Sequence, residues 1–244
     1  MSENVYETQR LVEEYLLFHY GTPEQVLGWA GGPESALGFP ERVAQHFGDT
    51  AVARALDIGC SVGRAAYTLS QIAEEVVAID YSHAFVEAAQ KLQQEGTQEI
   101  SRFLEGTSYD KVTVQRPTSG VPERISFKQG DAMNLPESLG TFDRVLAANL
   151  ICRLPEPLRF LKRLPLLVRP KGTVVLATPC TWLEEFTPPQ HFPTQSTFEW
   201  LKGQMQEHFM LEHHTNEPFL IRETARKFQW TVSEVTVWKK KASV

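Results

Sequence analysis

The stretch ALDIGCSVGR, residues 55–64, decides the fold of this chain. Its first four residues form a short, mainly apolar run that ends at a glycine, which is the pattern of a buried strand. Residues 63–72 follow with apolar side chains at helical spacing. A strand, a glycine-containing turn and a helix in this order predict the start of a βαβ unit, with the turn at the ligand-binding edge of a parallel sheet.

The same alternation of strands and helices continues along the chain. A second helical pattern covers 82–94, and Val232, Val235 and Val237 make the last strand apolar and central in the sheet. These elements predict an α/β fold, in which a Rossmann-like, mostly parallel sheet of seven strands is flanked by helices. The strands expected after 55–58 cover 76–80, 126–131, 142–148, 173–178, 209–213 and 230–238.

The N-terminal region differs from this rhythm. Residues 5–20 have the spacing of an amphipathic helix that ends at Gly21 and Pro23, and shorter helical patterns cover 23–29 and 34–47. We expect a single domain, 1–244, in which residues 1–50 form a helical cap, or lid, over a Rossmann-like core with insertions at 51–244.

Residues 100–125 are an insertion into the βαβ rhythm. The segments 100–104 and 111–115 are expected to pair as a hairpin across Gly106. Residues 180–225 flank the binding edge of the sheet, where we expect them, with the N-terminal cap, to cover it.

Composition limits the function classes. The 244 residues carry a formal net charge of -6, which is unlike a nucleic-acid-binding surface. The N-terminus lacks a signal-peptide pattern and no apolar run is long enough to span a membrane, so we expect a cytoplasmic protein without membrane contact. Cys60, Cys152 and Cys180 are far apart in the sequence and no metal-ligand spacing occurs, so we expect no disulfide framework and no metal site.

The loop at 57–63 favours one ligand class. A dinucleotide-binding loop needs Gly-x-Gly-x-x-Gly, but here Ser61 stands between Gly59 and Gly63. Asp57 lies two residues before the first glycine, where an acid is badly placed for a pyrophosphate and suits a ligand with an ammonium and a sulfonium group. A dehydrogenase is therefore the weakest alternative.

This loop resembles the Asp-x-Gly-x-Gly-x-Gly motif of Rossmann-like, class I S-adenosylmethionine-dependent methyltransferases, with Ser61 in place of the middle glycine. The resemblance implies that the loop holds the methionine part of the cofactor, Asp80 the ribose hydroxyls and Asp131 the adenine, while Asn149 bounds the methyl-transfer site. Each acid alone could be an ordinary helix cap or turn residue. The implied cofactor-binding residues are Asp57, Gly59, Cys60, Ser61, Gly63, Asp80, Tyr81, Ser82, Asp131, Ala132, Asn149 and Tyr20.

A closer resemblance covers nearly the whole chain. Eight segments are similar to the 4-mercaptohistidine (5-thiohistidine) N-methyltransferase of ovothiol biosynthesis, in its stand-alone form. The resemblance implies methylation of the imidazole nitrogen nearer the Cβ of 5-thiohistidine, which gives ovothiol A and S-adenosylhomocysteine, with a sulfoxide synthase or lyase as pathway neighbour. The segments are YLLFHYG (15–21), ALGFPERV (36–43), LDIGCSVGRAAY (56–67), AIDYSHAFVEAA (78–89), GDAMNLP (130–136), LAANLICRLPEP (146–157), TPCTWLEEFTP (178–188) and FLIRETARKFQWTVSEVTVWKK (219–240).

Such an acceptor sets requirements for the site. Its carboxylate favours an arginine, its ammonium a carboxylate such as Glu184 or Glu185, and its ring nitrogen must be unprotonated to attack. Each candidate also has an ordinary structural interpretation: Arg222 in an ion pair, the aromatic residues in the core. The candidates are Asn149 and His19 as catalytic groups, and Tyr15, Arg153, Trp182, Glu184, Arg222 and Phe228 as substrate-binding groups.

Two alternatives for the activity stay open. The chain could methylate another small molecule, such as a carboxylic acid, a phenol or an amine, with the same cofactor residues. It could also be a non-catalytic cofactor-binding partner of a sulfoxide synthase. The sequence leaves the oligomeric state undecided.

Overall fold

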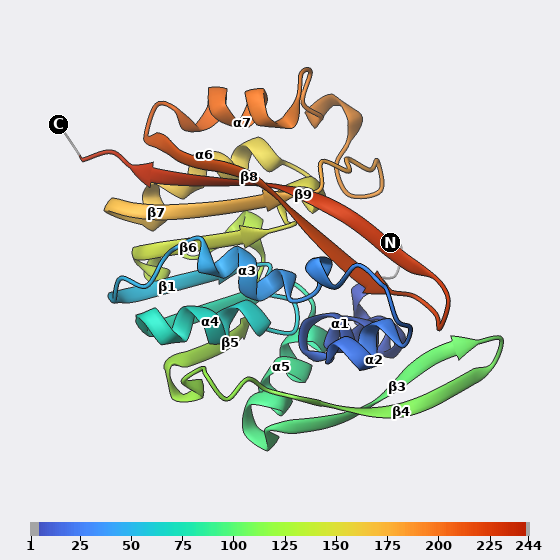
Figure 1. Cartoon of the computed structure of the whole chain (residues 1–244). Coiled ribbons are helices and arrows are strands. Elements are labelled where there is room, and N and C mark those ends of the chain that lie inside the picture. The colour runs from blue at the N-terminus through green and yellow to red at the C-terminus, as the bar shows by residue number, and fades with distance from the viewer. Residues whose placement is uncertain (1–4, 243–244) are drawn as a thin grey trace.

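A seven-stranded sheet forms the centre of the protein in the computed structural model, which describes residues 5–242 (Figure 1). Its strand order is β5-β2-β1-β6-β7-β9-β8. Five strands are parallel, whereas β9 is antiparallel to both β7 and β8. The predicted fold class is confirmed. The strands are β1 (Val52–Ile58), β2 (Ala73–Asp80), β5 (Ile125–Gln129), β6 (Phe142–Ala148), β7 (Val168–Thr178), β8 (Phe209–Arg222) and β9 (Phe228–Lys240).

Helices cover both faces of this sheet. Side chains alternate between the faces along a strand, so Val76 and Ala78 of β2 pack in one hydrophobic cluster while Val77 and Ile79 pack in the other. The first cluster lies under α1 (Gln9–Tyr20), α3 (Phe39–Gln45), α4 (Arg64–Ile72) and α5 (His83–Glu95). The second lies under α6 (Pro157–Leu167) and α7 (Thr197–Met205). α6, which contains Pro165, is not among the helices predicted from the sequence, although its apolar residues follow helical spacing.

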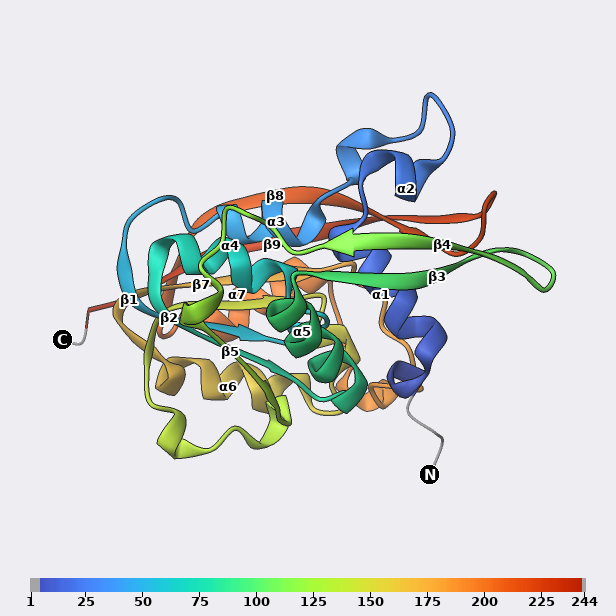
Figure 2. The same cartoon turned by 90° about the horizontal axis from the view of Figure 1, so that it is seen from below.

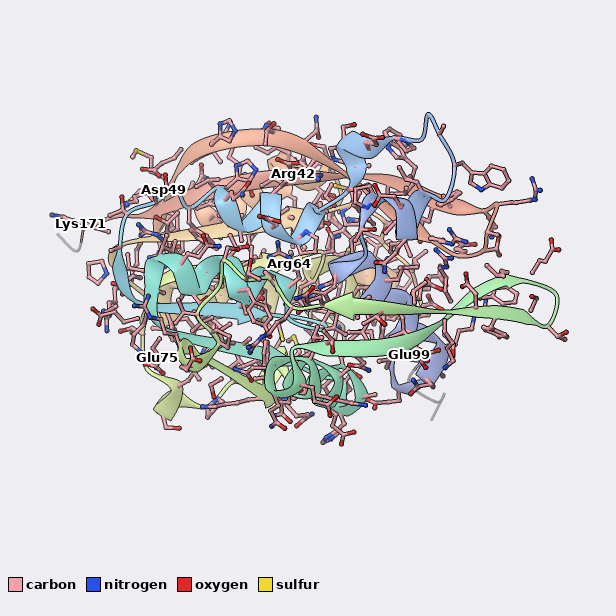
Figure 3. The ribbon with its side chains drawn as sticks, turned by 60° about the horizontal axis from the view of Figure 1, so that its bottom comes forward. Arg42, Asp49, Arg64, Glu75, Glu99 and Lys171 are labelled. Carbon is pink, nitrogen blue, oxygen red and sulfur yellow. The ribbon has the colours of Figure 1, made fainter. Side chains whose placement is uncertain are left out.

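The N-terminal region is helical as expected, with different boundaries. The predicted helix over 5–20 begins at Gln9, and the pattern over 34–47 divides into a 3-10 turn (Glu34–Ala36) and α3, because Gly38 has a left-handed φ of 67°. α2 (Pro23–Leu27) lies between α1 and the 3-10 turn. Residues 1–4 of the expected cap lie outside the described residues. Ion pairs of Arg42 with Glu217 and of Arg64 with Glu41 fix α3 to β8 and α4; Figure 3 labels the two arginines.

The insertion forms a separate two-stranded sheet, as predicted. β3 (Thr97–Glu105) pairs antiparallel with β4 (Ser108–Gln115), and the hairpin extends past α1 (Figure 2). β8 is longer than the predicted strand at 209–213, because its pairing with β9 continues to Arg222. Within residues 5–242, no helix combines the length and the apolar character needed to cross a membrane.

Candidate active site

A cavity of about 850 Å³ lies where the parallel strands end, and α1 forms one of its walls. Carboxyl ends of adjacent parallel strands meet at one edge, which is where α/β sheets bind ligands. Residues from the ends of β1, β2, β6 and β7 line the cavity together with residues from the N-terminal helices and β8. The predicted residues in this lining are Asp57, Gly59, Cys60, Ser61, Asp80, Tyr81, Asp131, Ala132, Asn149, His19, Tyr15 and Arg153.

The loop after β1 turns sharply under the cavity. The backbone N–H groups of Gly59 and Cys60 both donate to the Ile79 carbonyl, at 2.8 and 3.1 Å. Ser61 has a left-handed φ of 51°, so it takes the glycine-like conformation of the motif position it replaces. Gly63 lies outside the cavity lining, where a Cβ would come within 2.3 Å of the Phe127 ring. The second glycine therefore serves close packing of the loop.

Two carboxylates lie side by side at the ends of β1 and β2. Asp57 is only 2% exposed, and its Oδ2 has no hydrogen-bond partner within residues 5–242. Burial, and then the negative charge of Asp80, raise the pKa of Asp57 to about 7. The Asp80 carboxylate accepts hydrogen bonds from the backbone N–H groups of Ser61 and Ser82, at 2.7 and 2.9 Å. An unpaired acid in such a cavity favours a ligand that carries positive charge.

Asp131 and Asn149 extend the polar edge beyond β5 and β6. Asp131 accepts from the backbone N–H of Met133 at 2.8 Å, which fixes the turn after β5. Asn149 has a left-handed φ of 54°, and its Oδ1 accepts a hydrogen bond of 2.7 Å from the Ser233 hydroxyl of β9. The strained backbone and the side-chain bond together hold this amide at the cavity wall.

The lid helix α1 contributes Tyr15 and His19 to the lining. Burial lowers the pKa of His19 to about 3, with a smaller contribution from Arg64, so its imidazole is neutral near pH 7. Its Nδ1 is buried and has no hydrogen-bond partner in the described part of the chain. Tyr20 lies outside the lining, and its hydroxyl donates to the Val62 carbonyl at 2.7 Å. Tyr20 thus stabilises the loop after β1 from the side that faces away from the cavity.

Arg153 lies beyond Asn149, with its guanidinium 5.0 Å from the Phe186 ring centre. Its Nη1 donates to the Thr181 carbonyl at 2.8 Å and its Nη2 to the Thr181 hydroxyl at 3.2 Å. Tyr6 also forms a side-chain hydrogen bond with Arg153. Among residues 5–242, no carboxylate forms an ion pair with this guanidinium.

Arg222 is a correction to the sequence prediction. This buried side chain on β8 donates to the Val26 carbonyl at the end of α2, at 3.1 Å, and lies outside the cavity lining. Its neighbour Ile221 does line the cavity. Successive side chains of a strand point to opposite faces, so the arginine anchors α2 instead.

Four other predicted residues also lie outside the lining. The Trp182 indole donates to the Thr197 hydroxyl at 3.0 Å and packs against Trp200, and Phe228 packs against the hydrophobic core. Glu184 is exposed, whereas its neighbours Leu183 and Glu185 line the cavity. Ser82 caps α5 and donates to the Tyr6 carbonyl at 2.9 Å. Position near a strand end does not fix the direction of a side chain.

Sequence reasoning missed several lining residues, among them Tyr6, Glu14, Phe186 and Gln229. Only Glu14 has a readable signal. It is an acid at helical spacing with Leu11, Tyr15 and Phe18, which are apolar and partly buried. The others come from segments whose placement depends on tertiary packing.

Comparisons with known proteins agree with this geometry. A family model described as a methyltransferase domain matches residues 56–176. Methyltransferase GfsG of Streptomyces halstedii is 26% identical over 137 residues, which are 56% of this chain and 41% of that relative. The chain therefore matches less than half of the relative's length.

Two solved structures share the fold. A SAM-dependent methyltransferase from Methanosarcina mazei has a TM-score of 0.55 at 17% identity, over 81% of this chain and 97% of that one. The N-methyltransferase NodS of Bradyrhizobium japonicum, in complex with S-adenosylhomocysteine, has a TM-score of 0.54 at 13% identity, over 94% and 98% of the two chains. The matched methyltransferase domain lies across β1 to β7, and the chain has the fold of the class I methyltransferases.

Proposed function

We propose that the chain transfers the methyl group of S-adenosylmethionine to the imidazole nitrogen nearer the Cβ of 5-thiohistidine, which gives ovothiol A. One observation carries the proposal. Each of the eight segments that resemble the ovothiol enzymes contributes at least one residue to the lining of the cavity, although they span residues 15 to 240. A resemblance limited to the fold would not concentrate in this way.

The cofactor half of the cavity suits a cationic ligand. Asp57 pairs with the ammonium group, Asp80 accepts from the ribose hydroxyls and Asp131 lies at the adenine. Gly59, Cys60, Ser61, Tyr81 and Ala132 provide the surrounding surface. The unpartnered Asp57 carboxylate supports this assignment, because a bound cation would relieve its unfavourable burial. When bound, the cofactor supplies an electrophilic methyl group on a sulfonium.

The other half of the cavity orients the acceptor. Arg153 pairs with the substrate carboxylate, and Tyr15 packs against the flat ring. A neutral His19 or the Asn149 amide forms a hydrogen bond to the acceptor ring and selects the tautomer whose attacking nitrogen is unprotonated. Orientation of this kind can supply roughly 7–11 kcal/mol of the barrier reduction. The cavity of about 850 Å³ is at the upper end of ordinary ligand sites, which leaves room for a second small molecule.

Release of S-adenosylhomocysteine with different acceptors tests the proposal. We expect turnover with 5-thiohistidine, much weaker turnover with histidine and none with simple phenols. Equal rates for the thiolated and unthiolated rings would reject the ovothiol assignment and favour another small acceptor. Tight cofactor binding without turnover of any acceptor would favour a non-catalytic partner of a sulfoxide synthase.

A further inference from the structure

The face of α1 that lines the cavity carries one acidic side chain. Leu11, Tyr15 and Phe18 are partly buried against the core, and Glu14 lies among them at helical spacing. All four line the cavity. An acid among partly buried apolar side chains is unusual unless it has a partner.

Glu14 has no such partner among residues 5–242, where no hydrogen bond or ion pair involves its carboxylate. Arg10, one turn earlier, is near enough to attract it, but that guanidinium lies 4.7 Å from the centre of the Phe103 ring. Glu223 repels it and is itself paired with Lys227. Burial raises the pKa of Glu14. A half-buried carboxylate without a partner destabilises the ligand-free protein.

The neighbouring acid on the same helix, Glu13, has a structural role. Glu13 accepts hydrogen bonds from the Gln9 side chain at 3.2 Å and from the backbone N–H of Ser101 at 3.1 Å. These contacts attach α1 to the β3–β4 hairpin, away from the cavity lining. Glu14, in contrast, presents its charge to the cavity.

A guanidinium shares the chamber with this carboxylate. The Tyr15 hydroxyl is close enough to Glu14, Arg153 and Asp80 to be influenced by the charges of all three. Glu14 and Arg153 therefore both act on the surroundings of Tyr15, where Asp80 also lies, and among residues 5–242 they form no ion pair with each other. A ligand with separated positive and negative groups would satisfy both.

We propose that Glu14 binds the ammonium group of the methyl acceptor, and that Glu14 and Arg153 together recognise the zwitterion of an α-amino acid. The inference rests on the proposed function for the identity of the ring, and adds how the amino-acid part is selected. It also moves the ammonium contact from the segment after β7, where Glu184 is exposed, to the lid helix.

The test compares 5-thiohistidine with its analogue in which hydrogen replaces the α-amino group. kcat/KM is measured by S-adenosylhomocysteine release, and acceptor Kd by calorimetry on the S-adenosylhomocysteine complex. We expect the wild type to prefer the amine by about 10- to 100-fold, the range of a charge-assisted hydrogen bond, and Glu14→Gln to lose that preference. Glu13→Gln is the matched control and should keep it.

Two results would overturn the inference: an unchanged preference in Glu14→Gln, or an equal loss for both acceptors, which would mark a structural role. Thermal unfolding of both variants identifies a folding defect. The proposed function fails separately, if the wild type does not prefer the thiolated ring over histidine. The amine comparison is then repeated with histidine and its des-amino analogue, and the absence of Glu14-dependent discrimination there would also reject the inference.

Discussion

The proposed cofactor half of the cavity takes its acids from the ends of β1, β2 and β5, whereas the proposed acceptor half takes its polar groups from α1 and the segments after β6 and β7. In the first half, the polar residues belong to parallel strands whose register fixes them; Asp57 pairs with Ala78, two residues before Asp80. In the second, they come from elements brought together only by packing. The strand-end residues are therefore suited to bind the cofactor, whereas the residues placed by packing can determine which substrate is accepted.

Asp57→Asn should have the largest effect, on stability. The pKa of Asp57 is raised from 3.8 to about 7, so its ionisation in the folded protein is unfavourable. The sign follows from proton binding: between about pH 4 and pH 7 the folded state holds more protons, so stability falls as pH rises and stays low above pH 7. The variant removes this penalty, and at pH 8 should gain up to about 4 kcal/mol.

Denaturant unfolding at pH 4 and pH 8 measures this effect, and the gain should disappear at the lower pH. Binding of S-adenosylhomocysteine should also weaken in Asp57→Asn, and in the wild type should strengthen as pH rises through about 7. A variant less stable than the wild type at pH 8 would show that the acid has a partner in the folded protein.

Asp80→Ala tests the same half through ligand affinity. The change removes the carboxylate that accepts from Ser61 and Ser82 and, in the proposal, from the ribose. Calorimetric titration with S-adenosylhomocysteine should show a loss of about 3 kcal/mol, roughly a hundredfold in Kd. Asp49→Ala, at an exposed acid outside the lining, is the control. An unchanged Kd would contradict the placement of the ribose.

Arg153→Ala addresses the acceptor half. Loss of the guanidinium should raise the acceptor KM by about 10- to 100-fold, because the acceptor carboxylate loses its charged partner. Cofactor Kd should change little, since the proposed cofactor acids lie at the ends of β1, β2 and β5, whereas Arg153 lies in a 3-10 turn after β6. A larger effect on cofactor Kd than on acceptor KM would contradict the assignment of Arg153 to the acceptor half.

Arg222→Leu should have the smallest effect on catalysis. Its guanidinium holds the end of α2 at Val26, so the variant should lose about 1–2 kcal/mol of unfolding free energy and have a lower Tm. Acceptor KM should stay within about twofold of the wild type, as the side chain lies outside the cavity lining. A tenfold rise in KM with unchanged Tm would restore the role that its sequence position suggested.

The same contrast explains what the sequence could predict. The positions of Asp57, Asp80, Asp131 and Asn149 can be predicted from the sequence, because strand ends in a βαβ order converge at one edge of the sheet. Trp182 and Arg222 lie outside the cavity lining, because each side chain has a partner elsewhere, Thr197 and Val26, that the sequence does not reveal. Glu14 was missed although its apolar neighbours on the helix could have revealed it.

The most direct test of the account follows the methyl group itself. The protein is incubated with S-adenosylmethionine labelled with ¹³C at the methyl carbon and with 5-thiohistidine, and the product is examined by heteronuclear NMR. The account predicts a labelled N-methyl group on the ring nitrogen nearer the Cβ, and release of S-adenosylhomocysteine in equal amount. Label on the sulfur or on the other nitrogen, or no transfer by the folded, cofactor-binding protein, would contradict it.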